Sequence, residues 1–284
     1  MKDFKETFMK WVFKVTAAVS ILAVLLICVF LLAEGIPAIR EIGIAKFLGG
    51  RVWKPGSGIY GIFPMIIGSL YVTAGAIIIG VPIGLLTAVF MAKYCPKALY
   101  KILKPAIELL AGIPSVVYGF FGIVTIVPFV RDYIGGGGDS VLAASILLGI
   151  MILPTIISVT ESSIRAVPES YYEGALALGA TKERSIFATI IPAAKSGILA
   201  GVVLGIGRAI GETMAVIMVA GNWTQIPTSI TDGVRTMTAN IVIEMGYATD
   251  LHRGALVGTG VVLFVFILII NLSFSYIKNK ERKS

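Results

Sequence analysis

Six apolar runs divide the chain, and polar segments separate them. The runs cover roughly residues 12–33, 62–92, 106–130, 141–160, 197–220 and 255–277. A helix needs about 20 apolar residues to cross the hydrocarbon core of a bilayer, and each run approaches or exceeds that length. The pattern predicts an all-α polytopic membrane protein with six transmembrane helices, built as a single transmembrane domain over residues 1–284.

Two of the runs contain helix-breaking residues. Pro82 lies between Gly80 and Gly84 in the second run, which predicts a kink or a tilt there. Glu108 and the sequence Gly112-Ile113-Pro114 interrupt the third run. Since irregular backbone at membrane depth is tolerated only where protein or water covers it, we expect the third segment to lie in the interior.

Composition supports a membrane protein. Hydrophobic residues make up 57% of the 284 positions and charged residues only 14%, and the mean hydropathy is +0.92. An average soluble domain has about 25% charged residues. The net charge of +8 is dispersed among short segments between the apolar runs, so it does not form the single basic stripe that nucleic-acid binding needs.

The basic residues predict the orientation. The N-terminus, the segments 93–105 and 161–196, and the C-terminus hold 16 of the 24 lysines and arginines, and the intervening loops hold seven. Because cytoplasmic loops are enriched in Lys and Arg, we expect a cytoplasmic-membrane protein with both termini and the 161–196 loop in the cytoplasm. Two long outer loops are then expected at about 34–61 and 221–254.

Two charges stand in the middle of the fifth run, where Arg208 and Glu212 alternate with Gly207 and Gly211. A charge at the bilayer centre costs roughly 2.5–3.5 kcal/mol, and an exposed ion pair returns only about 0–1 kcal/mol. Residues four apart share one helical face. We expect this face to line a pathway for a polar solute; the alternative is that the two charges only pair with each other and lock two helices together.

The 161–196 segment predicts two short helices. Pro168 suits the first turn of a helix that runs to Leu178 and stops at Gly179. Thr181 can cap a second helix, on which an apolar stripe contains Ile186, Phe187, Ile190 and Ile191. Such a stripe needs a cover, either from the chain itself or from another protein.

No pattern in the chain predicts catalysis or a bound cofactor. Gly135 to Gly138 are not followed by the Lys-Ser/Thr of a phosphate-binding nucleotide loop. His252 has no cluster of ligands near it in the sequence, so we expect an interfacial histidine and no metal site. Trp53 and Trp223 lie at borders of apolar runs and are expected to anchor the chain at the membrane interface. We expect that the chain is not an enzyme.

The loop also carries a recognisable motif. Glu173-Gly174-Ala175, then Gly179, then Thr189-Ile190-Ile191-Pro192 resemble the Glu-Ala-Ala loop of ABC-importer permeases. Gly174, Thr189 and Ile191 depart mildly from that pattern. Further resemblance to the phosphate-importer permeases of the PstC type comes from residues 110–119, 165–168, 207–216, 53–55 and 237–240, and it covers nearly the whole chain.

This resemblance implies the type I ABC-importer permease fold and a set of partners. They are a sister permease of the PstA type in a heterodimer, two ATPase subunits of the PstB type that use ATP and magnesium, and an extracytoplasmic phosphate-binding protein of the PstS type. The coupling residues that it implies are Glu173, Gly174, Ala175, Gly179, Ala180, Thr181, Ile186 and Pro192.

For the cargo, the resemblance implies that Arg208 and Glu212 serve phosphate passage, with Gly207 and Gly211 beside them. Arg208 would donate to phosphate oxygens, and Glu212 would either accept the phosphate hydroxyl or hold Arg208 in place. The alternatives are a permease for another oxyanion, such as phosphonate, sulfate or molybdate, and an ion-coupled secondary carrier or channel, which would have no need of the Glu173-to-Pro192 loop.

Overall fold

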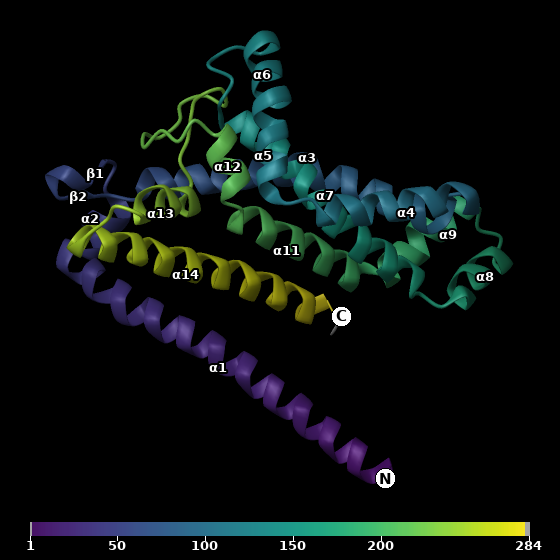
Figure 1. Cartoon of the computed structure of the whole chain (residues 1–284). Helices are drawn as coiled ribbons and strands as arrows, with labels where there is room; N and C mark the ends of the chain where they lie inside the picture. Colours follow the sequence, from purple (N-terminus) through teal and green to yellow (C-terminus); the bar gives the residue numbers. More distant parts are fainter. Residues whose placement is uncertain (1, 282–284) are drawn as a thin grey trace.

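The computed structural model describes residues 2–281, and it confirms a predominantly helical membrane protein (Figure 1). Within the described residues, five helices are long and apolar enough to cross a membrane, and a bent pair makes a sixth when it is counted as one span. The spans are Lys5–Ile42, Phe63–Tyr94, Ser115–Tyr133, Val141–Arg165 and Asp250–Ser273, together with the pair Lys182–Ala193 and Lys195–Gly211, which meet at 69°.

The first part of the chain is built around long helices. Its helices are α1 (Lys2–Ile42), α2 (Ile44–Gly49), α3 (Phe63–Val89), α4 (Lys97–Gly112), α5 (Ser115–Phe121) and α6 (Val127–Tyr133). Two short antiparallel strands, β1 (Trp53–Lys54) and β2 (Ile59–Tyr60), pair Trp53 with Tyr60. The predicted outer loop 34–61 therefore contains the end of α1, a helix and a hairpin.

The second part alternates long and short helices. They are α7 (Val141–Arg165), α8 (Glu169–Ala177), α9 (Lys182–Ser185), α10 (Ile191–Ala193), α11 (Lys195–Gly211), α12 (Met214–Val219), α13 (Met237–Met245) and α14 (Asp250–Glu281). The segments Phe90–Tyr94, Gly122–Ile126 and Ile186–Ile190 are π-helical turns that continue a neighbouring α-helix.

The core is organised around α7, which packs against α3 and α11. Leu147, Ile152 and Ile156 on α7 are fully buried. A Cβ added at Gly80 of α3 would come within 2.8 Å of the Gly149 carbonyl oxygen, so the two helices approach too closely for any other residue there. Pro82 lies inside α3 without ending it.

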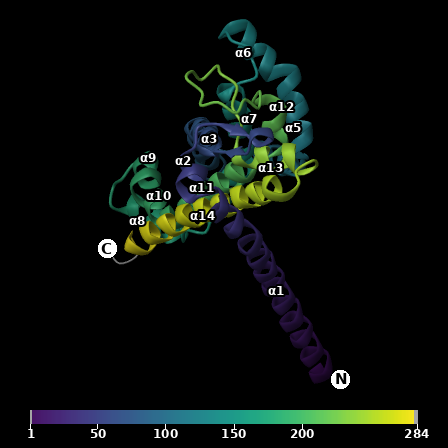
Figure 2. The same ribbon diagram turned by 90° about the vertical axis from the view of Figure 1, so that its left-hand side faces the viewer.

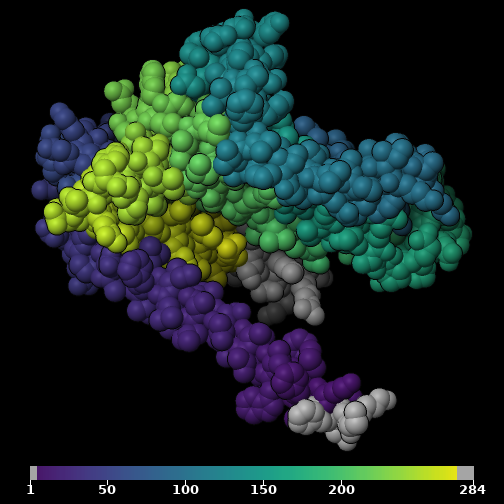
Figure 3. Space-filling view, in the orientation of Figure 1, coloured from purple at the N-terminus to yellow at the C-terminus, as the bar shows by residue number. Residues whose placement is uncertain are grey.

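The two ends of the molecule are built differently. Figure 1 shows the hairpin, α2 and α13 at one end and α8 and α9 at the other. We call these the hairpin end and the α8 end. The two views show that α1 contacts the rest of the chain near the hairpin end and then diverges from it (Figure 2). The space-filling view shows the same separation (Figure 3), and from Lys5 to Phe30 nearly every side chain of α1 is exposed.

The third apolar run differs from its prediction. The break at 112–114 is present, because α4 ends at Gly112 and α5 begins at Ser115. The segment is not interior in the single chain: Leu109 is 73% exposed and Phe120 is 63% exposed, whereas Ile107 and Tyr118 are buried. One apolar stripe packs on the core, and the remaining apolar surface faces outward.

Candidate functional site

The predicted pathway lies where the fifth span is broken. α11 ends at Gly211, and Glu212 has extended backbone with φ −69° and ψ 134° before α12 begins at Met214. The prediction that Arg208 and Glu212 share one continuous helical face is therefore wrong. A break at membrane depth frees backbone groups that need new partners.

Glu212 supplies some of these partners itself. Its Oε1 accepts a hydrogen bond from the backbone N–H of Ala215 at 3.1 Å, so the carboxylate caps the start of α12. Its backbone carbonyl accepts the hydroxyl of Thr238 on α13 at 3.0 Å. Glu212 thus joins α11, α12 and α13 at the break, a role that the sequence pattern did not indicate.

Arg208 points to a different partner. Its Nη1 donates a long hydrogen bond of 3.5 Å to the hydroxyl of Thr155 on α7. Among the described residues no ion pair joins Arg208 to Glu212. In this conformation the two charges therefore do not pair with each other, and Glu212 does not hold Arg208 in place. A side chain at Gly207 or Gly211 would meet nothing within 4 Å. The half-buried Arg208 guanidinium therefore has unused donors, and Gly207 and Gly211 on the same helix border open space.

The predicted coupling loop is found at the α8 end. Pro168 precedes the first residue of α8, and Gly179 adopts φ +84°, a left-handed conformation that favours glycine. The hydroxyl of Thr181 accepts the N–H of Arg184 at 3.3 Å and caps α9, as predicted. Glu173, Gly174 and Pro192 are exposed, and Ala175 and Ala180 are half-buried.

The apolar stripe of this loop is divided between two surroundings. Ile186 and Ile190 are fully buried, and Ile190 packs with Ile164 of α7. Phe187 is 55% exposed, and Leu178, beside Gly179, is 90% exposed. The chain itself covers one side of the stripe and leaves Leu178 and Phe187 uncovered, and we call these two exposed apolar side chains the tip of the loop.

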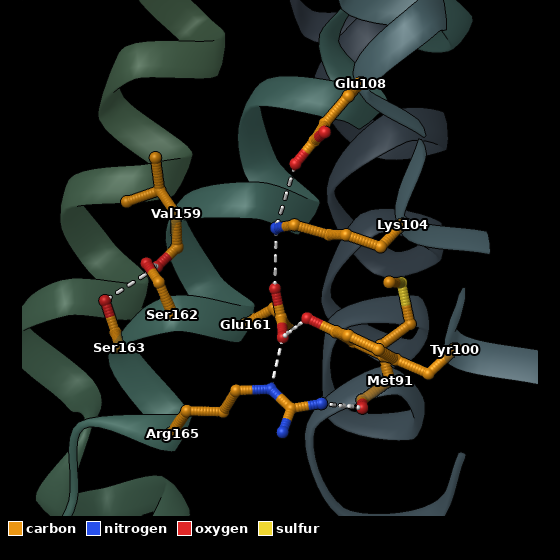
Figure 4. Close-up of polar contacts among 9 residues, drawn as sticks. All are labelled: Met91, Tyr100, Lys104, Glu108, Val159, Glu161, Ser162, Ser163 and Arg165. Atoms are coloured by element: carbon orange, nitrogen blue, oxygen red, sulfur yellow. Dashed lines mark hydrogen bonds and ion pairs between the residues drawn. The ribbon is translucent and has the colours of Figure 1, made fainter. Parts of the chain in front are cut away.

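A buried charge cluster, which the sequence pattern did not reveal, ties this loop to the membrane helices (Figure 4). Glu161 of α7 is 2% exposed and accepts hydrogen bonds from the Tyr100 hydroxyl and the Lys104 ammonium, both at 2.9 Å, and from Nε of Arg165. Nη2 of Arg165 donates to the Met91 carbonyl at 2.8 Å. The i,i+4 spacing of Glu161 and Arg165 was the available signal, but it does not predict the partners on α4.

A second network lies at the hairpin end. Glu244 of α13 is 6% exposed; it accepts Nε1 of Trp53 at 2.9 Å and Nη1 of Arg235 at 2.6 Å, and it contacts Nε2 of His252 at 2.9 Å. Trp53 is only 6% exposed, so the prediction that it anchors the chain at the membrane interface is wrong. Trp223 is 58% exposed. Within the described residues no cluster of His, Cys, Asp and Glu is suited to hold a metal ion.

Comparison with protein families decides the classification. The family described as "Binding-protein-dependent transport system inner membrane component" matches residues 80–283. The chain belongs to this family. The match includes the broken span at Glu212 and the whole of the 161–196 loop, so both candidate sites lie inside the family's shared region.

Individual relatives agree with this assignment. The probable ABC transporter permease protein YqgH of Bacillus subtilis is 38% identical over 273 residues, covering 94% of this chain and 88% of that protein. The phosphate transport system permease protein PstC of Mesorhizobium japonicum is 34% identical over 279 residues, covering 90% and 85%. PstC of Haemophilus influenzae is 32% identical over 293 residues, covering 95% and 93%.

Solved structures share the fold at low sequence identity. A chain of a bacterial alginate ABC transporter superposes with a TM-score of 0.66 at 15% identity, covering 97% of this chain and 96% of that one. A chain of the MetNI methionine ABC transporter gives 0.61 at 18% identity, covering 81% and 99%. These similarities confirm the type I permease architecture and carry no information on the cargo.

Proposed function

We propose that the chain is the permease subunit of an ATP-driven ABC importer that moves inorganic phosphate across the cytoplasmic membrane. The family membership and the PstC relatives support the class of transporter and the cargo. The structural observation that carries the proposal is the half-buried Arg208, which no carboxylate among the described residues neutralises and which shares its helix with Gly207 and Gly211, two positions that border open space.

The proposed passage of phosphate follows from the donor geometry. A guanidinium presents five N–H donors, and paired donors match two oxygens of a phosphate. A weak bond to Thr155 leaves most of these donors available. Oε1 of Glu212 holds the break in place by capping α12. A site with one strong cationic residue binds the anion and still releases it.

The proposed energy source is a separate ATPase at the α8 end. In this arrangement the α8 end faces the cytoplasm with both termini, as the distribution of basic residues favours. The exposed tip formed by Leu178 and Phe187 docks onto the ATPase, and the ATPase supplies all nucleotide chemistry. A sister permease completes the membrane domain, and an extracytoplasmic phosphate-binding protein delivers the cargo to the hairpin end.

The deciding experiment is uptake of radiolabelled phosphate by cells that carry this chain with its co-purifying sister permease, ATPase and binding protein. Arg208→Gln should lower uptake about 10- to 150-fold, because one hydrogen-bonding charge contributes roughly 1.5–3 kcal/mol. Arg131→Gln is the matched control, since Arg131 is 55% exposed and lies away from the break. Glu212→Gln, which keeps a capping oxygen, should retain uptake, and Glu212→Ala should reduce it.

Three results would contradict the proposal. Unchanged phosphate uptake in Arg208→Gln would remove Arg208 from the pathway. Uptake of labelled sulfate or molybdate in preference to phosphate would assign the permease to another oxyanion, and uptake that persists without an ATPase would indicate a secondary carrier or channel.

A further inference from the structure

A second cationic site lies at the α8 end, away from the pathway. A cavity of about 390 Å³ opens between the π-helical turn that follows α3, the end of α7 and the loop helices α8 and α9. Its charged lining residues are Lys93, Arg165, Lys182 and Glu169, and Tyr172 forms one wall. At about 30 Å³ per water molecule, the cavity has room for a phosphate group with several waters.

The three cations come from three different elements. Arg165 shares the carboxylate of Glu161 with Lys104, which lies outside the cavity. Lys93 has a side chain only 14% exposed, and its ammonium lies 3.6 Å from Glu169 and 5.7 Å from the Tyr172 ring centre. Lys182 lies 5.0 Å from the Tyr94 ring centre and has no carboxylate partner within residues 5–273. Three positive residues and one negative residue leave a net charge of +2 on the lining.

Arg165 adds oriented donors. Its Nε donates to Glu161 and its Nη2 to the Met91 carbonyl. The second terminal nitrogen, Nη1, makes no contact with the residues drawn in Figure 4, and no acceptor for it is found in the described part of the chain. The Glu161 cluster therefore fixes the guanidinium and leaves three of its five N–H groups, two on Nη1 and one on Nη2, without an acceptor in the described part of the chain.

Glu169 occupies the place that an anion would take. Its carboxylate is 64% exposed and approaches Lys93 from the first residue of α8. An exposed pair of this kind contributes about 0–1 kcal/mol, so a more highly charged anion displaces it readily. A phosphate group has enough acceptor oxygens to contact Lys93, Arg165 and Lys182 at once.

We propose that this cavity is a binding site for a phosphate group, supplied either as free inorganic phosphate or as a phosphomonoester lipid headgroup. The bound group ties α3 and α7 to α9 and releases Glu169, so it changes the attachment of α8 to the membrane helices. Under the orientation proposed above, the cavity faces the cytoplasm, and free phosphate there would be the product of transport; the site itself does not depend on that orientation.

The test measures binding of labelled inorganic phosphate to the purified complex by equilibrium dialysis. Every variant carries Arg208→Gln, which removes the pathway contribution. Lys93→Ala and Lys182→Ala should each weaken binding about tenfold, as expected for loss of one charge-assisted hydrogen bond. Lys97→Ala is the control of equal charge change, because Lys97 is exposed and does not line the cavity.

Glu169→Gln separates the proposal from a structural role of these residues. It should tighten phosphate binding several-fold, because the competing carboxylate is gone. Glu183→Gln, on α9 and outside the cavity, should leave binding unchanged. A loss of equal size in Lys97→Ala, or no gain in Glu169→Gln, would overturn the site.

The second arm distinguishes the source of the phosphate group. The complex is placed in nanodiscs of phosphatidylcholine, with or without phosphatidic acid at about one lipid in five. The lipid that co-purifies with the complex after detergent extraction is then measured. Retention of phosphatidic acid that depends on Lys93 and Lys182 assigns the site to the headgroup, and phosphate binding in detergent assigns it to the free ion. Either form of binding supports the proposed site. Phosphate uptake is a separate experiment, which tests the proposed function.

Discussion

Lys104 provides an internal comparison of two ion pairs with very different surroundings. Its ammonium lies 2.9 Å from Glu161, which is 2% exposed, and 3.9 Å from Glu108, which is 62% exposed. Replacing Glu161 with Gln removes a charge that three donors share, and a hydrogen bond to a charged group contributes about 1.5–3 kcal/mol. Because Lys104 and Arg165 are partly exposed and regain water, we expect a net loss of about 3 kcal/mol, at the low end of the 3–5 kcal/mol for a broken buried pair.

Replacing Glu108 with Gln should cost about 0–1 kcal/mol, because the pair is long and exposed. The assay is thermal unfolding of the purified complex in detergent, followed by loss of soluble monodisperse protein. At about 2–4 °C per kcal/mol, Glu161→Gln should lower Tm by roughly 6–12 °C and Glu108→Gln by less than about 4 °C.

Salt adds a second criterion. Raising ionic strength from about 0.1 M to 1 M shortens the screening length from roughly 10 Å to 3 Å. The small effect of Glu108→Gln should vanish at high salt, whereas the large effect of Glu161→Gln should persist. Equal Tm shifts for the two variants, or an effect of Glu161→Gln that high salt abolishes, would refute the view that burial of Glu161 holds the end of α7 against α4.

Three further predictions test other parts of the structure. Gly80→Val should destabilise the protein by several kcal/mol, because the valine side chain would collide with α7. Gly207→Ala is the control: its added methyl group meets open space, so this variant should unfold at the wild-type temperature in the thermal assay. Leu178→Ala should leave Tm and ATPase activity intact and uncouple ATP hydrolysis from uptake, because Leu178 is 90% exposed; coupled uptake at the normal ratio would remove it from the docking tip. Hydrogen bonds from the hydroxyl and N–H of Thr228 and from the N–H of Ser229 lower the pKa of Asp232. The ionised carboxylate therefore stabilises the folded loop above about pH 3.9, and this stabilisation is lost as the pH falls through the lowered pKa. Proteolysis of the loop between pH 7 and pH 3 should show the loss in the native chain and not in Asp232→Asn.

The sequence was sufficient for the elements whose cause is local. Apolar runs of membrane length predicted the spans, because hydrocarbon thickness sets helix length regardless of neighbours. Pro168, Gly179 and Thr181 predicted the limits of α8 and α9, because caps and left-handed glycines act within a few residues. These signals need no knowledge of the tertiary structure.

Contacts between distant segments were not predictable in this way. Arg208 and Glu212 are spaced as one helical face, but the hydroxyl of Thr238, which lies 26 residues further along the chain, bonds the Glu212 carbonyl where the helix is broken. The position of Trp53 in the sequence predicts an interfacial anchor, but in the structure its indole N–H donates to Glu244, which lies 191 residues away. Tyr100 and Lys104 meet Glu161 only because α4 folds back on α7.

The divergence of α1 from the body has a consequence for biogenesis. In a newly made copy, the part of α1 from Lys5 to Phe30 is a largely apolar helix that the rest of its own polypeptide leaves exposed. Lipid alone can solvate such a helix, so this first segment can insert into the membrane before the remainder of the chain has folded. The same exposed surface allows α1 to pack against a neighbouring subunit. A copy without partners would then differ from an assembled one in exposing the apolar surface of α1.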